Sequence, residues 1–135
     1  MENSDGQMTH EVVIEAYWDS AHQLSLPYAS KCNNLHGHRY RVLVRIAAER
    51  LNSQGMVIDF VTVKQYLKQF DHVNLNDHFN PSTAENIAAR LLENLANMVT
   101  MENNGAHVVS VEVSETRSTA AIAKWSNAWK ITRTS

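Results

Sequence analysis

The chain has 135 residues, of which 44% are hydrophobic and 19% are charged, and its formal net charge is −2. Residues 1–135 therefore fit one compact domain, with no basic field to hold a nucleic acid backbone and no apolar run long enough to cross a bilayer. The single cysteine excludes an intrachain disulfide and the first residues carry no secretion signal, so we expect a cytoplasmic protein that binds neither nucleic acid nor membrane.

Two strands are predicted in the first third of the chain. Residues 12–22 alternate between apolar and polar side chains, which is the period of a half-buried strand. The apolar face carries Val12, Ile14, Ala16 and Trp18, and the other face carries Glu15 and Asp19. A polar loop over 25–34 leads to a second strand over 36–46. One face of this strand carries His36, His38, Tyr40, Val42, Val44 and Ile46, and the wetter face carries Arg39, Arg41 and Arg45.

Two helices are predicted in the middle of the chain. Asp59 is a predicted N-cap for a helix over 60–70, whose apolar side chains recur at helical spacing. These side chains are Phe60, Val63, Leu67 and Phe70. Ser82, followed three residues later by Glu85, predicts a capping box for a helix over 83–99. Its buried stripe is Ile87, Leu91, Leu95 and Met98.

The last third predicts two more strands, over 107–116 and, more weakly, over 119–133. The first of them places Val109, Val111 and Val113 on one face. Two strands, two helices and two strands favour an α+β fold in which two helices cover one face of an antiparallel four-stranded sheet. Four strands cannot close a barrel, and the unpaired outer strands therefore predict self-association.

Three histidines form the clearest candidate site. Residues two apart in a strand point to the same side, so His36 and His38 of the HGH motif can bind one ion while Gly37 faces away. His22 ends the first strand on its apolar face, where an antiparallel partner strand would bring it beside them. Three neutral imidazoles with one open position are typical of catalytic zinc, so the sequence predicts a Zn²⁺ site.

Two alternatives to this site stay open. Any one of the three histidines, taken alone, is more commonly a polar strand or turn residue. Cys32 could also serve as a fourth ligand, which would give a closed structural zinc site. If Cys32 is not a ligand, a nearby metal would favour its thiolate and make it a base or nucleophile. Alternatively, Cys32 is a small buried hydrophobic residue without a chemical role.

Three further residues are candidates for chemistry. Asp71 and His72 follow the first predicted helix, and a carboxylate that orients an imidazole commonly fixes its tautomer, although both could equally cap a helix end. Glu115 has the parity of Val113 and so lies at the end of an apolar strand face, where a carboxylate needs a partner. The partner could be an arginine, or a guanidine-like edge such as that of a pterin.

Six short motifs occur in order along the chain, and they are AH, CNNLHGHRYRV, GMVIDF, DHVNLN, PSTAEN and SET. Together they resemble the 6-pyruvoyltetrahydropterin synthase and 6-carboxytetrahydropterin synthase family, over most of the chain. The resemblance implies that the histidines of AH and HGH bind catalytic zinc, that the cysteine and the DH pair are catalytic, and that the glutamate of SET anchors the pterin ring. In this sequence the implied residues are His22, His36, His38, Cys32, Asp71, His72 and Glu115.

The resemblance also implies an architecture. The family has the tunnelling fold, in which subunits of ββααββ order assemble into barrels with active sites at subunit boundaries. We therefore expect a homo-oligomer, a trimer or a hexamer, whose partner is a small-molecule pterin. Phe70 stands where leucine commonly precedes DH, and the tail after Thr116, with Trp125 and Trp129, departs from the family pattern.

The spacing of Cys32 and His36 bears on the reaction. Cys32 lies just before HGH, at the short spacing typical of the 6-carboxytetrahydropterin branch. That branch converts 7,8-dihydroneopterin triphosphate to 6-carboxy-5,6,7,8-tetrahydropterin, a precursor of queuosine and related deazapurines, with release of acetaldehyde and triphosphate. The alternatives are a 6-pyruvoyltetrahydropterin synthase and a zinc- or pterin-binding protein without turnover. A zinc hydrolase would leave Cys32 and Glu115 without a role.

Overall fold

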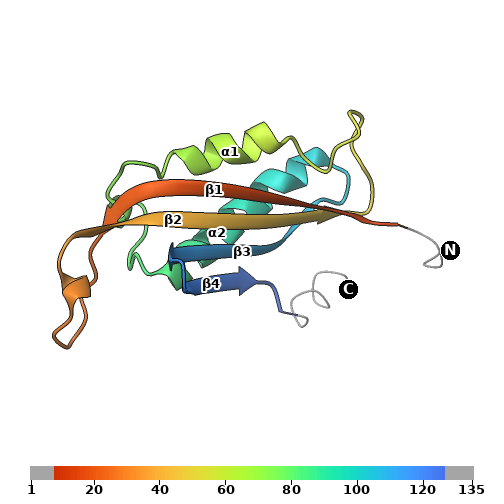
Figure 1. The fold of residues 1–135 in the computed structure, drawn as a ribbon. Coiled ribbons are helices and arrows are strands. Elements are labelled where there is room, and N and C mark those ends of the chain that lie inside the picture. The colour runs from red at the N-terminus through yellow and green to blue at the C-terminus, as the bar shows by residue number, and fades with distance from the viewer. Residues whose placement is uncertain (1–7, 127–135) are drawn as a thin grey trace.

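The computed structural model describes residues 8–126 and confirms the predicted α+β fold. The strands are β1 (His10–His22), β2 (His36–Ala48), β3 (His107–Thr116) and β4 (Thr119–Lys124), and the helices are α1 (Phe60–Lys68) and α2 (Ala84–Val99). Three short 3-10 helices, η1 (Lys31–Asn33), η2 (Leu75–Asp77) and η3 (Thr100–Glu102), lie in the connections. The strands form one antiparallel sheet in the order β1-β2-β3-β4, and both helices lie on one side of it (Figure 1).

The predicted alternation of apolar and polar side chains along β1 and β2 determines which of their residues enter the core. Ile14 and Trp18 of β1 are buried, as are the four residues of β2 that share their face, which are Tyr40, Val42, Val44 and Ile46. These side chains join those of α1 and α2 in one hydrophobic cluster. The two strands pair along their whole length, so that His22 at the end of β1 lies directly opposite His36 at the start of β2.

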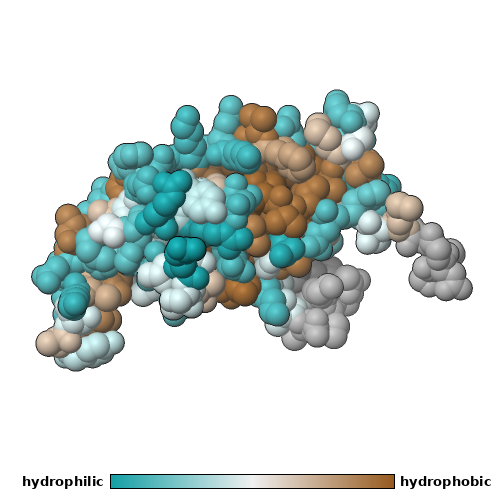
Figure 2. All heavy atoms as spheres, in the orientation of Figure 1, coloured by the Kyte–Doolittle hydropathy of each residue, from teal (hydrophilic) through white to brown (hydrophobic). Residues whose placement is uncertain are grey.

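The other face of the sheet carries charged side chains that pair across neighbouring strands. These pairs are Arg39 with Asp19, Arg41 with Glu15 and Glu112, and Arg45 with Glu11. Figure 2 shows hydrophilic side chains over much of the molecule, with a hydrophobic area in the middle of the view. No helix within residues 8–126 packs on this face, so its ion pairs are partly exposed to solvent and contribute little to the stability of the fold.

A β-bulge in β3 changes which of its side chains face the core, compared with the prediction from alternation. Arg45 pairs with Ser110, and its neighbour Ile46 pairs with Val108, so Val109 is an extra residue in the ladder. Val108 is therefore the buried side chain, 1% exposed, and the prediction for Val109 is wrong. Alternation alone could not show this, because a bulge shifts the parity of every residue before it.

The helix predictions are confirmed in part. Asp59 caps α1, because its side chain accepts a hydrogen bond from the Val61 N–H at 2.9 Å. Phe60, the first residue of α1, is 51% exposed, so the prediction that it is buried is wrong. Phe70 is buried but lies beyond the end of α1.

The cap of α2 differs from the predicted one. Thr83 caps the helix by accepting a hydrogen bond from the Asn86 N–H at 3.2 Å, so the predicted capping box of Ser82 with Glu85 is wrong. Ser82 is instead fully buried beside His22. The rest of the buried stripe is confirmed, with Met98 only partly covered.

The tail after β4 is described only as far as residue 126. Trp125 packs against the core, whereas Trp129 and the rest of the predicted strand after residue 126 lie outside the described residues. Within residues 8–126, no helix has the length and apolar character that a membrane span requires.

Candidate functional site

The three predicted metal ligands lie together at one end of the sheet. The antiparallel register sets His22 opposite His36 and places His38 two residues further along the same face of β2. The nitrogen atoms that these side chains offer all lie within 4.8 Å of one another, and the Nε2 atoms of His22 and His36 are 3.0 Å apart. His22 is only 1% exposed. The strand period and the register therefore bring the three histidines to one face at one end of the sheet.

Hydrogen bonds to carbonyl groups determine which ring nitrogens face the centre. The Nδ1 atom of His22 lies 2.8 Å from the Ser82 carbonyl oxygen, and the Nδ1 atom of His36 lies 2.7 Å from the Asn34 carbonyl oxygen. Because a carbonyl only accepts, each Nδ1 carries the proton and each Nε2 presents a lone pair. Two lone pairs that face each other at 3.0 Å repel unless a cation lies between them.

This donor set fits zinc. Zn–N distances of about 2.0–2.1 Å place the nitrogens of a tetrahedral site about 3.3 Å apart, within the range that the three imidazoles span. Ring N–H groups that donate to backbone carbonyls are also the usual outer contacts of zinc-bound histidines. His22, His36 and His38 are therefore the residues that could hold a metal ion here.

The environment of His38 favours the neutral imidazole. Burial lowers the pKa of His38, the neighbouring His36 and His22 lower it further, and Glu115 acts in the opposite direction. The ring of Tyr40 packs edge-on against both His22 and His38, with centroids 5.8 and 5.6 Å away. A neutral imidazole is the form that binds metals, so burial prepares His38 for this role.

Glu115 reaches the histidine cluster from β3. Its Oε2 atom lies 3.4 Å from the Nε2 atom of His22, and its side chain is 27% exposed. Among residues 8–126 the side chain beside this carboxylate is the His22 imidazole, and no arginine forms an ion pair with Glu115. Glu115 also lines an open pocket together with Tyr17, Arg39, Arg41, Ser114, Thr116 and Arg117. A carboxylate is thus available where a ligand can enter beside the histidines.

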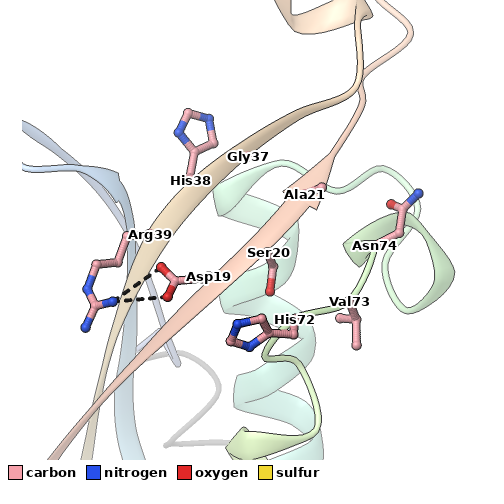
Figure 3. Close-up of a pocket in the computed structure, with 9 residues that line it drawn as sticks. All are labelled: Asp19, Ser20, Ala21, Gly37, His38, Arg39, His72, Val73 and Asn74. Atoms are coloured by element: carbon pink, nitrogen blue, oxygen red, sulfur yellow. Dashed lines mark hydrogen bonds and ion pairs between the residues drawn. The ribbon is translucent and has the colours of Figure 1, made fainter.

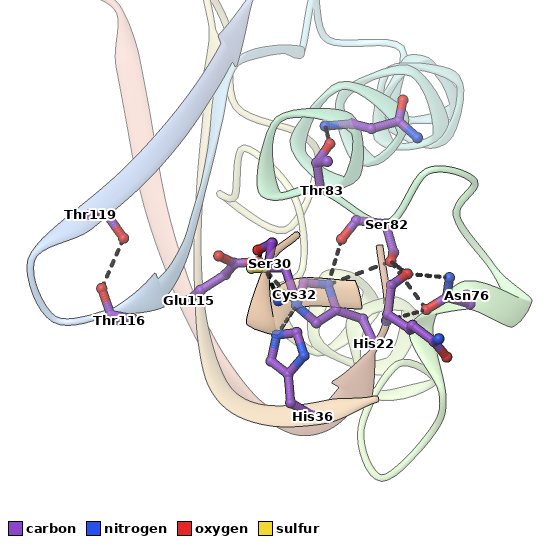
Figure 4. A network of polar contacts seen from close by, with 12 residues as sticks. His22, Ser30, Cys32, His36, Asn76, Ser82, Thr83, Glu115, Thr116 and Thr119 are labelled. Atoms are coloured by element: carbon purple, nitrogen blue, oxygen red, sulfur yellow. Dashed lines mark hydrogen bonds and ion pairs between the residues drawn. The ribbon is translucent and has the colours of Figure 1, made fainter. Parts of the chain in front are cut away.

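Cys32 lies in η1, in the loop between β1 and β2. The hydroxyl of Ser30 caps this turn by accepting the Cys32 N–H at 3.1 Å, and the Cys32 carbonyl accepts the Leu24 N–H at 2.8 Å. Figure 4 shows Cys32 at the same end of the sheet as His22, His36 and Glu115. In the described part of the chain, its sulfur is not a member of the close group of ligand atoms. The geometry therefore favours a three-histidine centre with a separate thiol over a closed four-ligand site.

Asp71 and His72 do contact each other, which their adjacency in sequence left open. The Nδ1 atom of His72 lies 3.0 Å from Oδ1 of Asp71. The backbone N–H of Asp19, and then His72, lower the pKa of Asp71, so its carboxylate is ionised near neutral pH. His72 has a left-handed backbone with φ of 57°, and its side chain is 76% exposed. This pair therefore presents an oriented imidazole to solvent.

The Asp–His pair lies at the outer edge of β1. The His72 N–H donates to the Asp19 carbonyl, and the Ala21 N–H donates to the Val73 carbonyl. Figure 3 shows His72 and His38 lining one open pocket, with β1 running between them. Within residues 8–126, no recorded contact joins Asp71 or His72 to Cys32. The described chain thus brings together the three predicted metal ligands and Glu115, but not the three predicted catalytic residues.

The predictions missed two side chains that contact His22 or its neighbour. Ser82 touches the His22 ring, and Asn76 binds the backbone of Gln23 through both ends of its amide. Asn76 is the last residue of the DHVNLN motif, and Ser82 lies in the PSTAEN motif. Their polar character was visible in the sequence, but their contacts span more than 50 residues of chain and depend on the tertiary structure.

Known proteins with similar sequences belong to the family that the six motifs resemble. The profile of the 6-pyruvoyl tetrahydropterin synthase family matches residues 11–125. A Synechocystis protein named 6-carboxy-5,6,7,8-tetrahydropterin synthase is 37% identical over 118 residues, which cover 79% of this chain and 87% of that protein. A Pyrococcus horikoshii relative is 44% identical over 71 residues, and the matched segment spans only 45% of its length.

A solved structure of a member of this family has the same fold. The 6-pyruvoyl tetrahydropterin synthase of Caenorhabditis elegans superposes with a TM-score of 0.69 at 25% sequence identity, over 89% of this chain and 98% of that one. The family profile covers the three histidines, Cys32, the Asp–His pair and Glu115. The chain belongs to the 6-pyruvoyl tetrahydropterin synthase family.

Proposed function

We propose that this protein converts 7,8-dihydroneopterin triphosphate and water to 6-carboxy-5,6,7,8-tetrahydropterin, acetaldehyde and triphosphate, with Zn²⁺ bound by His22, His36 and His38. The observation that carries the proposal is the set of imidazoles whose free nitrogens face one point beside Glu115. The relatives named 6-carboxytetrahydropterin synthases support the choice of substrate and product.

The metal centre would bind the side chain of the substrate. Held by His22, His36 and His38, zinc would supply Lewis-acid chemistry for the hydroxyl groups of that side chain. The carbonyls of Ser82 and Asn34 hold two of the imidazoles in the tautomer that leaves Nε2 free for the metal.

Glu115 would hold the pterin ring. The amino group and the neighbouring ring N–H of a pterin form a guanidine-like edge, to which a carboxylate can accept two parallel hydrogen bonds. Glu115 suits this role because it is partly exposed, it lines an open pocket and its carboxylate is not taken up by an arginine of the described chain. The ring would then lie beside the metal centre with its side chain directed toward the histidines.

Cys32 and the Asp–His pair would move the protons. In the proposed reaction the Cys32 thiolate takes or returns protons at the side chain of the substrate, and His72 acts as its counterpart. The ionised Asp71 accepts the Nδ1–H of His72, which leaves Nε2 as the atom that exchanges a proton. Triphosphate leaves by elimination, and the side chain is cleaved to acetaldehyde.

A homo-oligomer, a trimer or a hexamer, would complete this arrangement. Cys32 and His72 do not contact each other within residues 8–126, so in the proposed reaction each would work with the other residue from a neighbouring copy. Among the described strands β4 pairs with β3 alone, and its other edge is available for another strand. Pairing of outer strands between copies would bury this edge and place two different segments at one boundary.

A second candidate is the synthase that keeps the three-carbon side chain and releases only triphosphate. The likeness to the C. elegans 6-pyruvoyl tetrahydropterin synthase favours it. The short spacing between Cys32 and His36 favours the carboxy product. The two candidates share the metal centre and Glu115, and they differ in whether acetaldehyde is formed.

The deciding experiment is incubation of zinc-loaded protein with 7,8-dihydroneopterin triphosphate, followed by measurement of triphosphate, acetaldehyde and product mass. We expect equal amounts of triphosphate and acetaldehyde. Triphosphate without acetaldehyde would identify the second candidate. Neither product, from protein that binds both zinc and the pterin, would leave a binding protein without turnover.

A further inference from the structure

We propose that Asn76 and Ser82 are positioning residues that hold His22 in the orientation and tautomer that a metal ion requires. Ser82 contacts Nδ1 of His22, the ring nitrogen turned away from the other histidines, and Asn76 bonds to the main chain of Gln23, so both would act through His22. The proposal rests on the zinc centre proposed above. It concerns how one of the three ligands is held, which the strand register alone does not decide.

The first step is the contact between Ser82 and His22. The Ser82 carbonyl oxygen lies 2.8 Å from Nδ1 of His22, and its Oγ atom lies 3.4 Å from the same nitrogen. Both residues are buried, at 0% and 1% exposure. Water therefore cannot easily replace this carbonyl, and the position of residue 82 decides which nitrogen of His22 carries the proton.

The second step is the attachment of Asn76 to the end of β1. Its Oδ1 atom accepts the Gln23 N–H at 2.8 Å, and its Nδ2 atom donates to the Gln23 carbonyl at 2.8 Å. The side-chain amide thus takes the place of a neighbouring strand for the residue directly after His22. Asn76 is itself held in η2, because its N–H donates to Oδ1 of Asn74 at 3.0 Å.

The third step joins the two contacts. The Ser82 hydroxyl donates to Oδ1 of Asn76 at 3.2 Å, so Asn76 links the backbone after His22 to the residue that holds its ring (Figure 4). These contacts connect segments about 50 to 60 residues apart in the chain. They hold the main chain and the imidazole of His22 at the same time.

His36 provides an internal contrast. Its Nδ1 atom bonds to the Asn34 carbonyl two residues earlier, so its own turn sets its tautomer. His22 depends instead on two distant segments. Loss of Asn76 should therefore disturb His22 and leave His36 unchanged.

The test compares zinc binding by the full chain and by three variants, using competition with a chelator. Asn76→Ala should weaken zinc binding about ten- to a hundredfold, the range seen when outer contacts of metal ligands are removed. Ser82→Ala should act in the same direction with a smaller effect, because its carbonyl stays in place. Replacing zinc with Co²⁺ should show an altered visible spectrum in Asn76→Ala, which reports ligand geometry.

Asn52→Ala is the matched control. The side chain of Asn52 accepts from the Gln54 and Met56 N–H groups and donates to Glu102, each at 3.0 Å, beyond the far end of β2. Its loss should lower the urea midpoint of unfolding and leave zinc affinity unchanged. Equal weakening of zinc binding in both asparagine variants would overturn the proposal, as would wild-type affinity in Asn76→Ala.

A second measurement needs no metal. Long-range ¹H–¹⁵N NMR spectra of the metal-free protein distinguish protonated from unprotonated ring nitrogens. We expect His22 to be protonated on Nδ1 in the wild type and to populate both tautomers in Asn76→Ala, while His36 stays the same. Unchanged His22 signals would contradict the positioning role. A wild-type protein that binds no zinc would instead remove the proposed metal centre, and the NMR comparison would still decide on Asn76.

Discussion

The histidine centre and the Asp71–His72 pair are built in opposite ways. The centre is placed by two long strands whose register and parity allow little variation, and His22 is buried within it. The pair lies on a connection at the edge of β1, with a left-handed backbone at His72 and an exposed imidazole. The described chain thus brings the three predicted metal ligands together by itself, whereas the Asp–His pair is oriented but faces outward.

The largest expected effect breaks the centre itself. His22→Ala removes the most buried of the three ligands, and we expect loss of zinc binding and of activity, since a Lewis acid is worth several kcal/mol to such a reaction. Zinc content per chain, measured by elemental analysis, checks this. His107→Ala is the matched control, because His107 is an exposed residue at the start of β3. Full zinc content in His22→Ala would refute the three-histidine assignment.

The next largest effect is expected from variants that lower the catalytic rate but keep the metal ion bound. Cys32→Ala and His72→Ala should each lower kcat by about 10²- to 10⁴-fold, the usual contribution of general acid–base groups, with zinc content unchanged. Single-turnover rates on zinc-loaded protein measure this effect. Wild-type turnover by either variant would remove that residue from the proposed mechanism.

Mixing these two inactive variants tests the contrast between the two regions directly. If Cys32 and His72 meet across a boundary between copies, random reassembly of an equal mixture restores about a quarter of the sites. Activity should therefore return to roughly that fraction of the wild-type rate. No recovery from fully exchanged oligomers would show that both residues act within one subunit.

A smaller effect is expected at the ring anchor. Glu115→Gln keeps the shape of the side chain but weakens hydrogen bonds that a charged carboxylate makes, which are worth about 1.5–3 kcal/mol. The KM for the pterin should rise about 10- to 100-fold while zinc content stays the same. An unchanged KM would place the ring elsewhere in the pocket.

The smallest effect concerns acid stability at the Asp–His pair. The pKa of Asp71 is lowered from its ordinary value of 3.8, so its stabilising contribution is present above that value and is lost as the pH falls through the lowered one. Asp71→Asn should therefore lose less stability than the wild type between pH 5 and about pH 3. Urea unfolding across this range measures the difference. Parallel curves for the two proteins would show that Asp71 is not specifically held in its ionised form.

The predictions from sequence succeeded where a repeating pattern decides the outcome. Parity along 12–22 and 36–46 placed His22, His36 and His38 on one face, because side chains in a strand alternate without exception until a bulge intervenes. The same reasoning failed at Val109, where such a bulge occurs. The sequence could not decide whether Cys32 joins the histidines as a fourth ligand. Cys32 lies in a loop, and a loop has no repeating pattern from which its path can be predicted.

The amino-acid sequence by itself determined the order of the elements, the buried faces of the first two strands and the three candidate metal ligands. Only the tertiary structure decided that the Ser82 carbonyl and the Asn76 amide hold the end of β1, and that the Asp71–His72 pair does not contact Cys32 within residues 8–126. The physical reason is the range of the interactions. Periodicity acts between neighbours in the chain, whereas these contacts join segments that become neighbours only when the core packs.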